Sequence, residues 1–82
     1  MQILPLKAAY RKTLNKYGLA DKFEKQKKLF ELDPHHPSLH TEKLLPKHLN
    51  IYSFRIDRKW RAIFIVTRDN KAEIIDINLH YR

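Results

Sequence analysis

The chain has 82 residues, enough for one domain with one hydrophobic core and too few for two. Its 17 lysine and arginine residues against 9 aspartate and glutamate residues give a formal net charge of +8, so nucleic acid or an acidic protein is the expected partner. The absence of cysteine excludes disulfides and thiolate metal sites and favours a location in the cytoplasm. We expect no signal peptide, and no segment has the roughly 20 apolar residues that a membrane span needs.

The first half of the chain predicts a helical hairpin. A short extended segment over residues 2–4 precedes residues 7–17, which have helical composition and stop at Gly18, a residue suited to a helix C-cap. A second amphipathic helix is expected from residue 19 or 20 to Glu31. Residues 33–37 end it, because proline lacks an N–H and forces the preceding residue into an extended conformation.

The second half predicts strands. Residues 42–45, 51–57, 60–67 and 72–79 are rich in β-branched and aromatic residues. Short connections between them favour an antiparallel meander of three to five strands. The predicted fold is α+β, with the helical hairpin packed on one face of a small, twisted antiparallel sheet, in a single domain over residues 1–82.

Turn lengths predict the register of the strands. If residues 57–59 form a three-residue turn, Arg55 lies opposite Arg61, and if Asp69 and Asn70 form a two-residue turn, Arg61 lies opposite Asn78. This register collects polar side chains on one face: Ser53, Arg55, Arg61, Asp76, Asn78 and His80.

The same register places Phe64 opposite Ile75 on the oily face, which the helices should cover. It also places Ile63, Ile65 and Ile74 on the polar face. A large apolar group on an open face is costly, so we expect a partner to cover these three isoleucines.

Arg55 and Arg61 are the best candidates for phosphate contacts, because a planar guanidinium donates two parallel hydrogen bonds to phosphate oxygens. The alternative is that they pair with Asp57 or Asp76 in surface ion pairs. Basic residues are dense in this part of the chain: Lys43, Lys47, Arg55, Arg58, Lys59 and Arg61.

Three further residues are candidates for chemistry or RNA contact. His80, at the end of the last strand, can transfer a proton near neutral pH, although a terminal histidine is more often simply exposed. Tyr81 can stack on a base or pack on the sheet edge. Glu42, a carboxylate among cations, can act as a general base or be a solvated acid.

Other site classes are disfavoured. The histidines at positions 35, 36 and 40 have no cysteine or acidic partner at ligand spacing, so no metal site is expected. The chain also lacks a glycine-rich phosphate loop, a serine nucleophile motif and a glycosidase carboxylate pair.

Five short motifs together resemble the RelE/ParE superfamily of toxins from type II toxin-antitoxin systems. They are Pro-Ser-Leu at 37–39, Glu-Lys-Leu at 42–44, Tyr-Ser-Phe-Arg-Ile at 52–56, Trp-Arg-Ala-Ile-Phe at 60–64 and His-Tyr at 80–81. The resemblance covers nearly the whole chain, and the spacing of Glu42, Arg55 and Arg61 with the closing His-Tyr is most similar to the YoeB-type branch.

This resemblance implies a ribosome-dependent mRNA endoribonuclease, or mRNA interferase, that cleaves messages in the ribosomal A site without a metal or other cofactor. By the same resemblance, Glu42 is the general base, Arg61 stabilises the transition state and His80 is the general acid. Tyr81 supports the site, and Arg55 is a further basic residue on the same face. The implied partners are the ribosome and a cognate antitoxin.

Alternatives remain open. The loop over residues 46–50 lacks the glycine often found there in the family, and Lys43 or Lys47 can replace Glu42 as the base, as lysines do in other members. A ParE-like inhibitor of DNA gyrase without nuclease activity is the second candidate, and a degenerate, non-toxic RNA-binding relative is the third. The antitoxin is expected to be acidic or amphipathic and to lie over the polar face and the helical hairpin.

Overall fold

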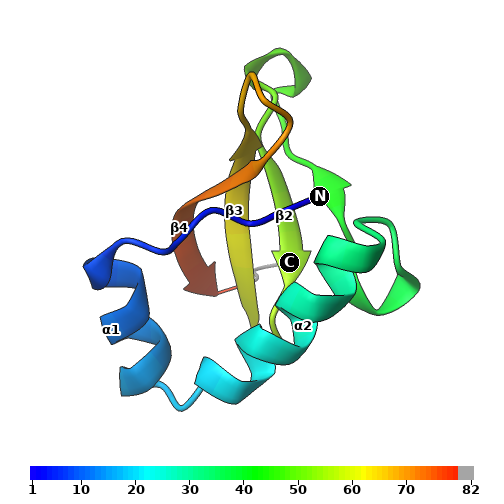
Figure 1. The fold of residues 1–82 in the computed structure, drawn as a ribbon. Coiled ribbons are helices and arrows are strands. Elements are labelled where there is room, and N and C mark those ends of the chain that lie inside the picture. Colours follow the sequence, from blue (N-terminus) through cyan, green and yellow to red (C-terminus); the bar gives the residue numbers. More distant parts are fainter. Residues whose placement is uncertain (80–82) are drawn as a thin grey trace.

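Two helices cover one face of a four-stranded antiparallel sheet in the computed structural model, which describes residues 1–79 (Figure 1). The strands are β1 (Glu42–Lys43), β2 (Tyr52–Arg55), β3 (Trp60–Val66) and β4 (Ala72–Leu79), and they lie in the sheet in their sequence order. The predicted α+β fold, a helical hairpin on a small antiparallel meander, is therefore confirmed.

The helices begin and end within one residue of their predicted ends. Helix α1 (Ala8–Lys16) is followed by Gly18 at φ 63°, a left-handed conformation that glycine adopts without steric cost. Helix α2 (Ala20–Leu32) ends where Asp33 becomes extended before a proline. No helix within residues 1–79 has the length and apolar character needed to cross a membrane.

The core lies between α2 and the sheet and is built on aromatic rings. The ring of Phe30, fully buried on α2, lies 5.1 Å from that of Phe54 on β2 and 5.1 Å from that of Phe64 on β3. Leu39, in the short 3-10 helix η1 (Pro37–Leu39), is also fully buried. This core fixes the positions of the strands.

The N-terminal segment also joins the fold, which the sequence does not predict. Ile3 forms a parallel bridge with Ala72 at the start of β4, and Leu4 N–H donates to the Ala72 carbonyl at 2.8 Å. Ile3 is 3% exposed and belongs to the core.

The strand register confirms the two predicted pairs that matter for the polar face. Arg55 lies opposite Arg61, and Arg61 lies opposite Asn78. The predicted two-residue turn after β3 is wrong: Thr67 N–H donates to the Lys71 carbonyl at 2.8 Å, which leaves three residues in the turn. Asn70 closes this turn at φ 62°, the left-handed conformation that such hairpins need.

A β-bulge in β4 compensates for the extra turn residue. Phe64 pairs with Ile74 and not with Ile75 as predicted, while Ile63 pairs with Asp76. Ile75 is therefore the additional residue of the bulge. The prediction for Ile74 is also wrong, because this side chain is 4% exposed and lies in the core.

Ile63 and Ile65 do lie on the side predicted for them, away from the helices. Ile63, however, is only 6% exposed, and its cross-strand neighbour Ser53 is 3% exposed. The chain itself already buries Ile63, so this isoleucine does not require a partner to cover it.

Candidate functional site

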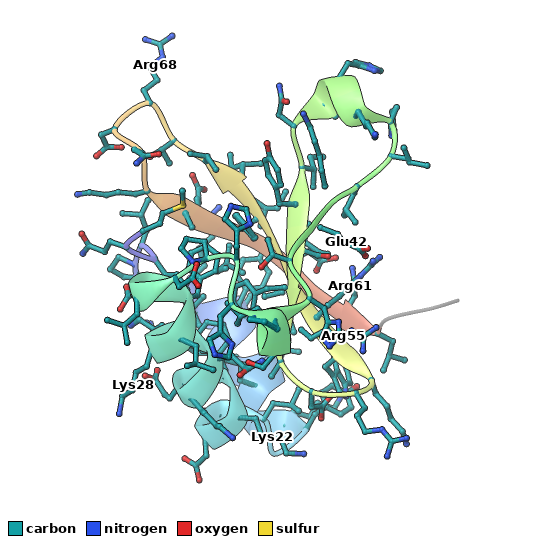
Figure 2. The ribbon with its side chains drawn as sticks, turned by 90° about the vertical axis from the view of Figure 1, so that its right-hand side faces the viewer. Lys22, Lys28, Glu42, Arg55, Arg61 and Arg68 are labelled. Atoms are coloured by element: carbon teal, nitrogen blue, oxygen red, sulfur yellow. The ribbon has the colours of Figure 1, made fainter. Side chains whose placement is uncertain are left out.

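The face of the sheet opposite the helices carries two adjacent cross-strand rows. One row is formed by Arg55, Arg61 and Asn78, and the other by Glu42, Ser53, Ile63 and Asp76. Cross-strand partners point to the same side of a sheet, and so do residues two apart on one strand. We call these seven residues the polar face. Figure 2 shows the side chains of Glu42, Arg55 and Arg61 gathered together, with Arg68 and Lys28 far from them.

The Arg61 side chain is held in place by a short hydrogen-bond chain. Its Nε donates to Asn78 Oδ1 at 3.1 Å, and Asn78 Nδ2 donates in turn to Asp76 Oδ2 at 2.8 Å. The terminal nitrogens of the guanidinium donate to no group within residues 1–79. Asn78 therefore orients the Arg61 guanidinium, whose two terminal nitrogens can donate to an anion.

The two strand arginines do not form the surface ion pairs weighed as their alternative role. Within residues 1–79, the ion pairs are Lys22 with Asp57 at 3.3 Å and Lys71 with Asp69 at 3.6 Å. Neither Arg55 nor Arg61 pairs with a carboxylate of that part of the chain, and both are half-buried. Two adjacent guanidinium groups that form no direct ion pair within residues 1–79 can attract an anion.

Asp57 explains why the turn between β2 and β3 has three residues. Its Oδ1 accepts hydrogen bonds from the backbone N–H groups of Lys59 at 2.8 Å and Trp60 at 2.7 Å, and Lys22 binds its other oxygen. Burial raises the pKa of Asp57, but the N–H groups of Trp60 and Lys59, together with Lys22, outweigh this effect and hold the pKa below its usual value. The charged Asp57 thus fixes the turn that sets Arg55 opposite Arg61.

Of the three candidate bases, only Glu42 lies on the polar face. It is exposed on β1, opposite Ser53 and one row from the arginines. Lys43 is opposite Tyr52 on the other side, with its Nζ 5.8 Å from the centre of the Tyr52 ring. Lys47 lies in the 3-10 helix η2 (Lys47–Leu49) in the loop between β1 and β2. The sheet therefore brings together Glu42, Arg55 and Arg61, and leaves the two lysines out.

The remaining predicted residues flank this group or lie outside the described part of the chain. Arg58 and Lys59 are exposed residues of the turn after β2. His80 and Tyr81 follow β4 in the sequence and lie outside the described residues. Among residues 1–79, no group of three histidine, cysteine, aspartate or glutamate side chains is arranged to hold a metal ion.

Sequence reasoning missed Gln26. This α2 residue is 8% exposed, and its Nε2 donates to the backbone carbonyls of Arg55 at 2.8 Å and Ser38 at 3.2 Å. The signal was available: Gln26 is three residues after Phe23 and four before Phe30, so it lies on the buried face of the helix. A glutamine in such a position is expected to hydrogen-bond to the backbone. Here it joins α2 to β2 at Arg55, a residue of the polar face.

Comparison with known proteins identifies the fold. No protein-family model matches the chain, and no curated protein matches its sequence. Among solved structures, a YoeB/ParE toxin from Agrobacterium tumefaciens is similar over 99% of this chain and 100% of its own, with a TM-score of 0.70 and 16% identity. A YoeB dimer from Staphylococcus aureus is similar over 98% of this chain and 94% of its own, with a TM-score of 0.64 and 22% identity. The expected fold, that of YoeB/ParE-type structures, is thus confirmed over 98–99% of the chain.

Proposed function

We propose that this chain is the toxin of a type II toxin-antitoxin system and inhibits translation as a ribosome-dependent mRNA endoribonuclease. The observation that carries this proposal is the gathering of Glu42, Arg55 and Arg61 on the face of the sheet opposite the helices. The two structural neighbours, one described as a YoeB/ParE toxin and the other as a YoeB dimer, support the toxin role. The net charge of +8 fits a partner as rich in phosphate as the ribosome.

The proposed reaction needs two proton transfers and one site for negative charge. The Glu42 carboxylate takes the proton of a ribose 2′-hydroxyl, whose oxygen then attacks the adjacent phosphorus. Arg61, with Arg55 beside it, stabilises the charge that builds up on the phosphate oxygens. His80 gives a proton to the departing 5′-oxygen, so that the products are a 2′,3′-cyclic phosphate and a 5′-hydroxyl. Tyr81 supports the site, and no step requires a metal ion.

The hydrogen-bond chain through Asn78 supports Arg61 as the main charge-stabilising residue. A preorganised donor is most effective when it does not have to reorient as charge develops. Arg61 has its Nε fixed by Asn78, whereas no side-chain hydrogen bond within residues 1–79 orients the Arg55 guanidinium. We therefore expect Arg61 to contribute more to the rate than Arg55.

Primer extension on messenger RNA tests the proposal. The chain is expressed in bacteria, or added to messages with and without ribosomes, and cleavage is expected only where ribosomes are present. Arg61→Gln should reduce cleavage by about 100-fold or more, as loss of a charge-stabilising donor does. Arg68→Gln, which makes the same change at the distant β3–β4 turn, is the matched control. Wild-type cleavage by both Arg61→Gln and His80→Ala would refute the assignment.

The same expression experiment separates the alternative functions. A ParE-like protein would leave messages intact and inhibit supercoiling by DNA gyrase. A degenerate, non-toxic relative would neither arrest growth nor inhibit supercoiling by DNA gyrase. The proposed partner that neutralises toxicity is a cognate antitoxin with an acidic or amphipathic segment, which covers the polar face by charge complementarity.

A further inference from the structure

A pocket of about 210 Å³ lies beside Arg55, between α2, η1 and the turn after β2. Six residues with polar side chains line it: Gln26, Ser38, His40, Arg55, Asp57 and Arg58. We propose that it is a second phosphate subsite, which binds the phosphodiester next to the scissile one in single-stranded RNA. This inference rests on the proposed nuclease function and extends it to the neighbouring nucleotide.

The charges around the pocket favour an anion. Arg55, Arg58 and His40 line the pocket, and guanidinium and imidazole groups can donate hydrogen bonds to phosphate. The one carboxylate, Asp57, is already engaged by two backbone N–H groups and by Lys22 at 3.3 Å. Its charge is offset, so the pocket keeps a net attraction for phosphate.

The pocket is built on a rigid base. The buried Gln26 side chain joins α2 to η1 and β2 through its two hydrogen bonds to the carbonyls of Ser38 and Arg55. At the end of η1, His40 adopts a left-handed conformation with φ 45°, and its N–H donates to the Pro37 carbonyl at 3.2 Å. These contacts hold the pocket walls before any ligand binds, which lowers the cost of ordering them on binding.

Gln26 also gives a reason to expect RNA. The Nε2 atom of Gln26 donates to two backbone carbonyls. Its side-chain oxygen, Oε1, accepts no hydrogen bond from a donor within residues 1–79. Gln26 is one of the lining residues, and a buried acceptor is costly unless a ligand or water donates to it. A ribose 2′-hydroxyl is such a donor, and it is the group that distinguishes RNA from DNA.

Arg55 connects the pocket to the proposed catalytic group. It lines the pocket and is also the cross-strand partner of Arg61, and the Cβ atoms of such partners are about 5 Å apart. One nucleotide advances a stacked strand by about 3.4 Å and an extended strand by more, so two consecutive phosphates can meet the two arginines. A strand with its scissile phosphate at Arg61 would thus place the next phosphate at Arg55 and Arg58.

NMR titration with short RNA tests the subsite without requiring cleavage. The probe is a dinucleotide with a 2′-deoxy first sugar, which prevents cleavage, used without a terminal phosphate, with a 5′-phosphate or with a 3′-phosphate. At fixed salt, the wild type should bind one of the two phosphorylated forms at least fivefold more tightly than the unphosphorylated form. The increase in affinity that the terminal phosphate gives should fall below twofold in Arg58→Gln and in His40→Gln. It should persist in the matched control Arg68→Gln.

Two results would overturn the subsite: equal binding of all three forms by the wild type, or an undiminished gain in Arg58→Gln. The backbone amide spectrum of each variant confirms that it is folded. Because binding is measured with an uncleavable probe, absence of mRNA cleavage would refute the nuclease and leave this result unaffected. Conversely, ribosome-dependent cleavage by a protein whose affinity for the dinucleotide is not increased by a terminal phosphate would refute only the subsite.

Discussion

Replacing the buried Gln26 with leucine should destabilise the fold, although leucine is the more hydrophobic residue. The Gln26 side chain is 8% exposed and donates to the carbonyls of Arg55 and Ser38 at 2.8 and 3.2 Å. Leucine has a similar volume but no donor, so both carbonyl groups lose their side-chain partner. The substitution thus isolates the hydrogen bonds from the packing.

The size of the effect follows from the burial of the two carbonyls. A buried polar group left without a partner costs about 1–3 kcal/mol. Residue Arg55 is half-buried, whereas Ser38 is exposed and its carbonyl can regain a water molecule. Gln26 lines a pocket in which water can donate to its Oε1, so removal of this acceptor changes the balance little. Subtracting the gain from the more apolar side chain, we expect a net loss of about 2 kcal/mol in the free energy of unfolding.

Urea unfolding followed by circular dichroism measures this loss. For a domain of this size the slope is about 1 kcal/mol per molar urea, so the midpoint should fall by roughly 2 M. Gln2→Leu makes the same replacement at an exposed position and should change the free energy of unfolding by less than about 0.5 kcal/mol. A midpoint for Gln26→Leu equal to or above that of the wild type would show that the two hydrogen bonds do not support the fold.

Two further predictions concern the turn and the orienting asparagine. Since the pKa of Asp57 is lowered in the fold, its charged form stabilises the protein above the usual value of 3.8, and this contribution is lost as the pH falls through the lowered pKa. In urea unfolding at pH 7, the free energy of unfolding of the wild type should therefore be about 1 kcal/mol larger than that of Asp57→Asn. This difference should shrink below pH 4, and a difference that does not vary with pH would contradict the prediction. Asn78→Ala removes the hydrogen bond that orients Arg61. It should lower the mRNA cleavage rate about fivefold with little change in the affinity for the ribosome. An equal fall in the cleavage rate and in this affinity would instead indicate a general loss of structure.

The sequence predicts the elements well wherever the signal is local. Gly18 ends α1 and a proline follows the last residue of α2 by two positions, so both helices are found within one residue. Asp57 can accept hydrogen bonds from the turn that follows it, and this turn gives the Arg55–Arg61 pair. Local chemistry thus accounts for the half of the polar face that lies on β2 and β3.

Features made by distant segments are not predicted. The bridge between Ile3 and Ala72 joins residues from opposite ends of the chain, and no short pattern indicates it. The side of the sheet that Glu42 occupies depends on how the loop over residues 44–51 returns the chain to β2, and that loop contains a cis peptide bond before Pro46 and a left-handed Asn50. Its path cannot be read from the pattern of apolar residues alone.

The bulge in β4 is the feature that unites the core with the polar face. Side chains alternate strictly along a regular strand, so Ile74 and Asn78 would lie on the same side without it. The protein requires Ile74 in the core against Phe64, and Asn78 on the opposite face beside Arg61. One extra residue reverses the alternation between them and meets both requirements. The sequence predicts the Arg61–Asn78 pair through a shorter turn and a regular strand, and the pair is present because the longer turn and the bulge cancel. The signal for the bulge is the spacing of two buried isoleucines, at positions 74 and 77, by an odd number of residues within a single strand.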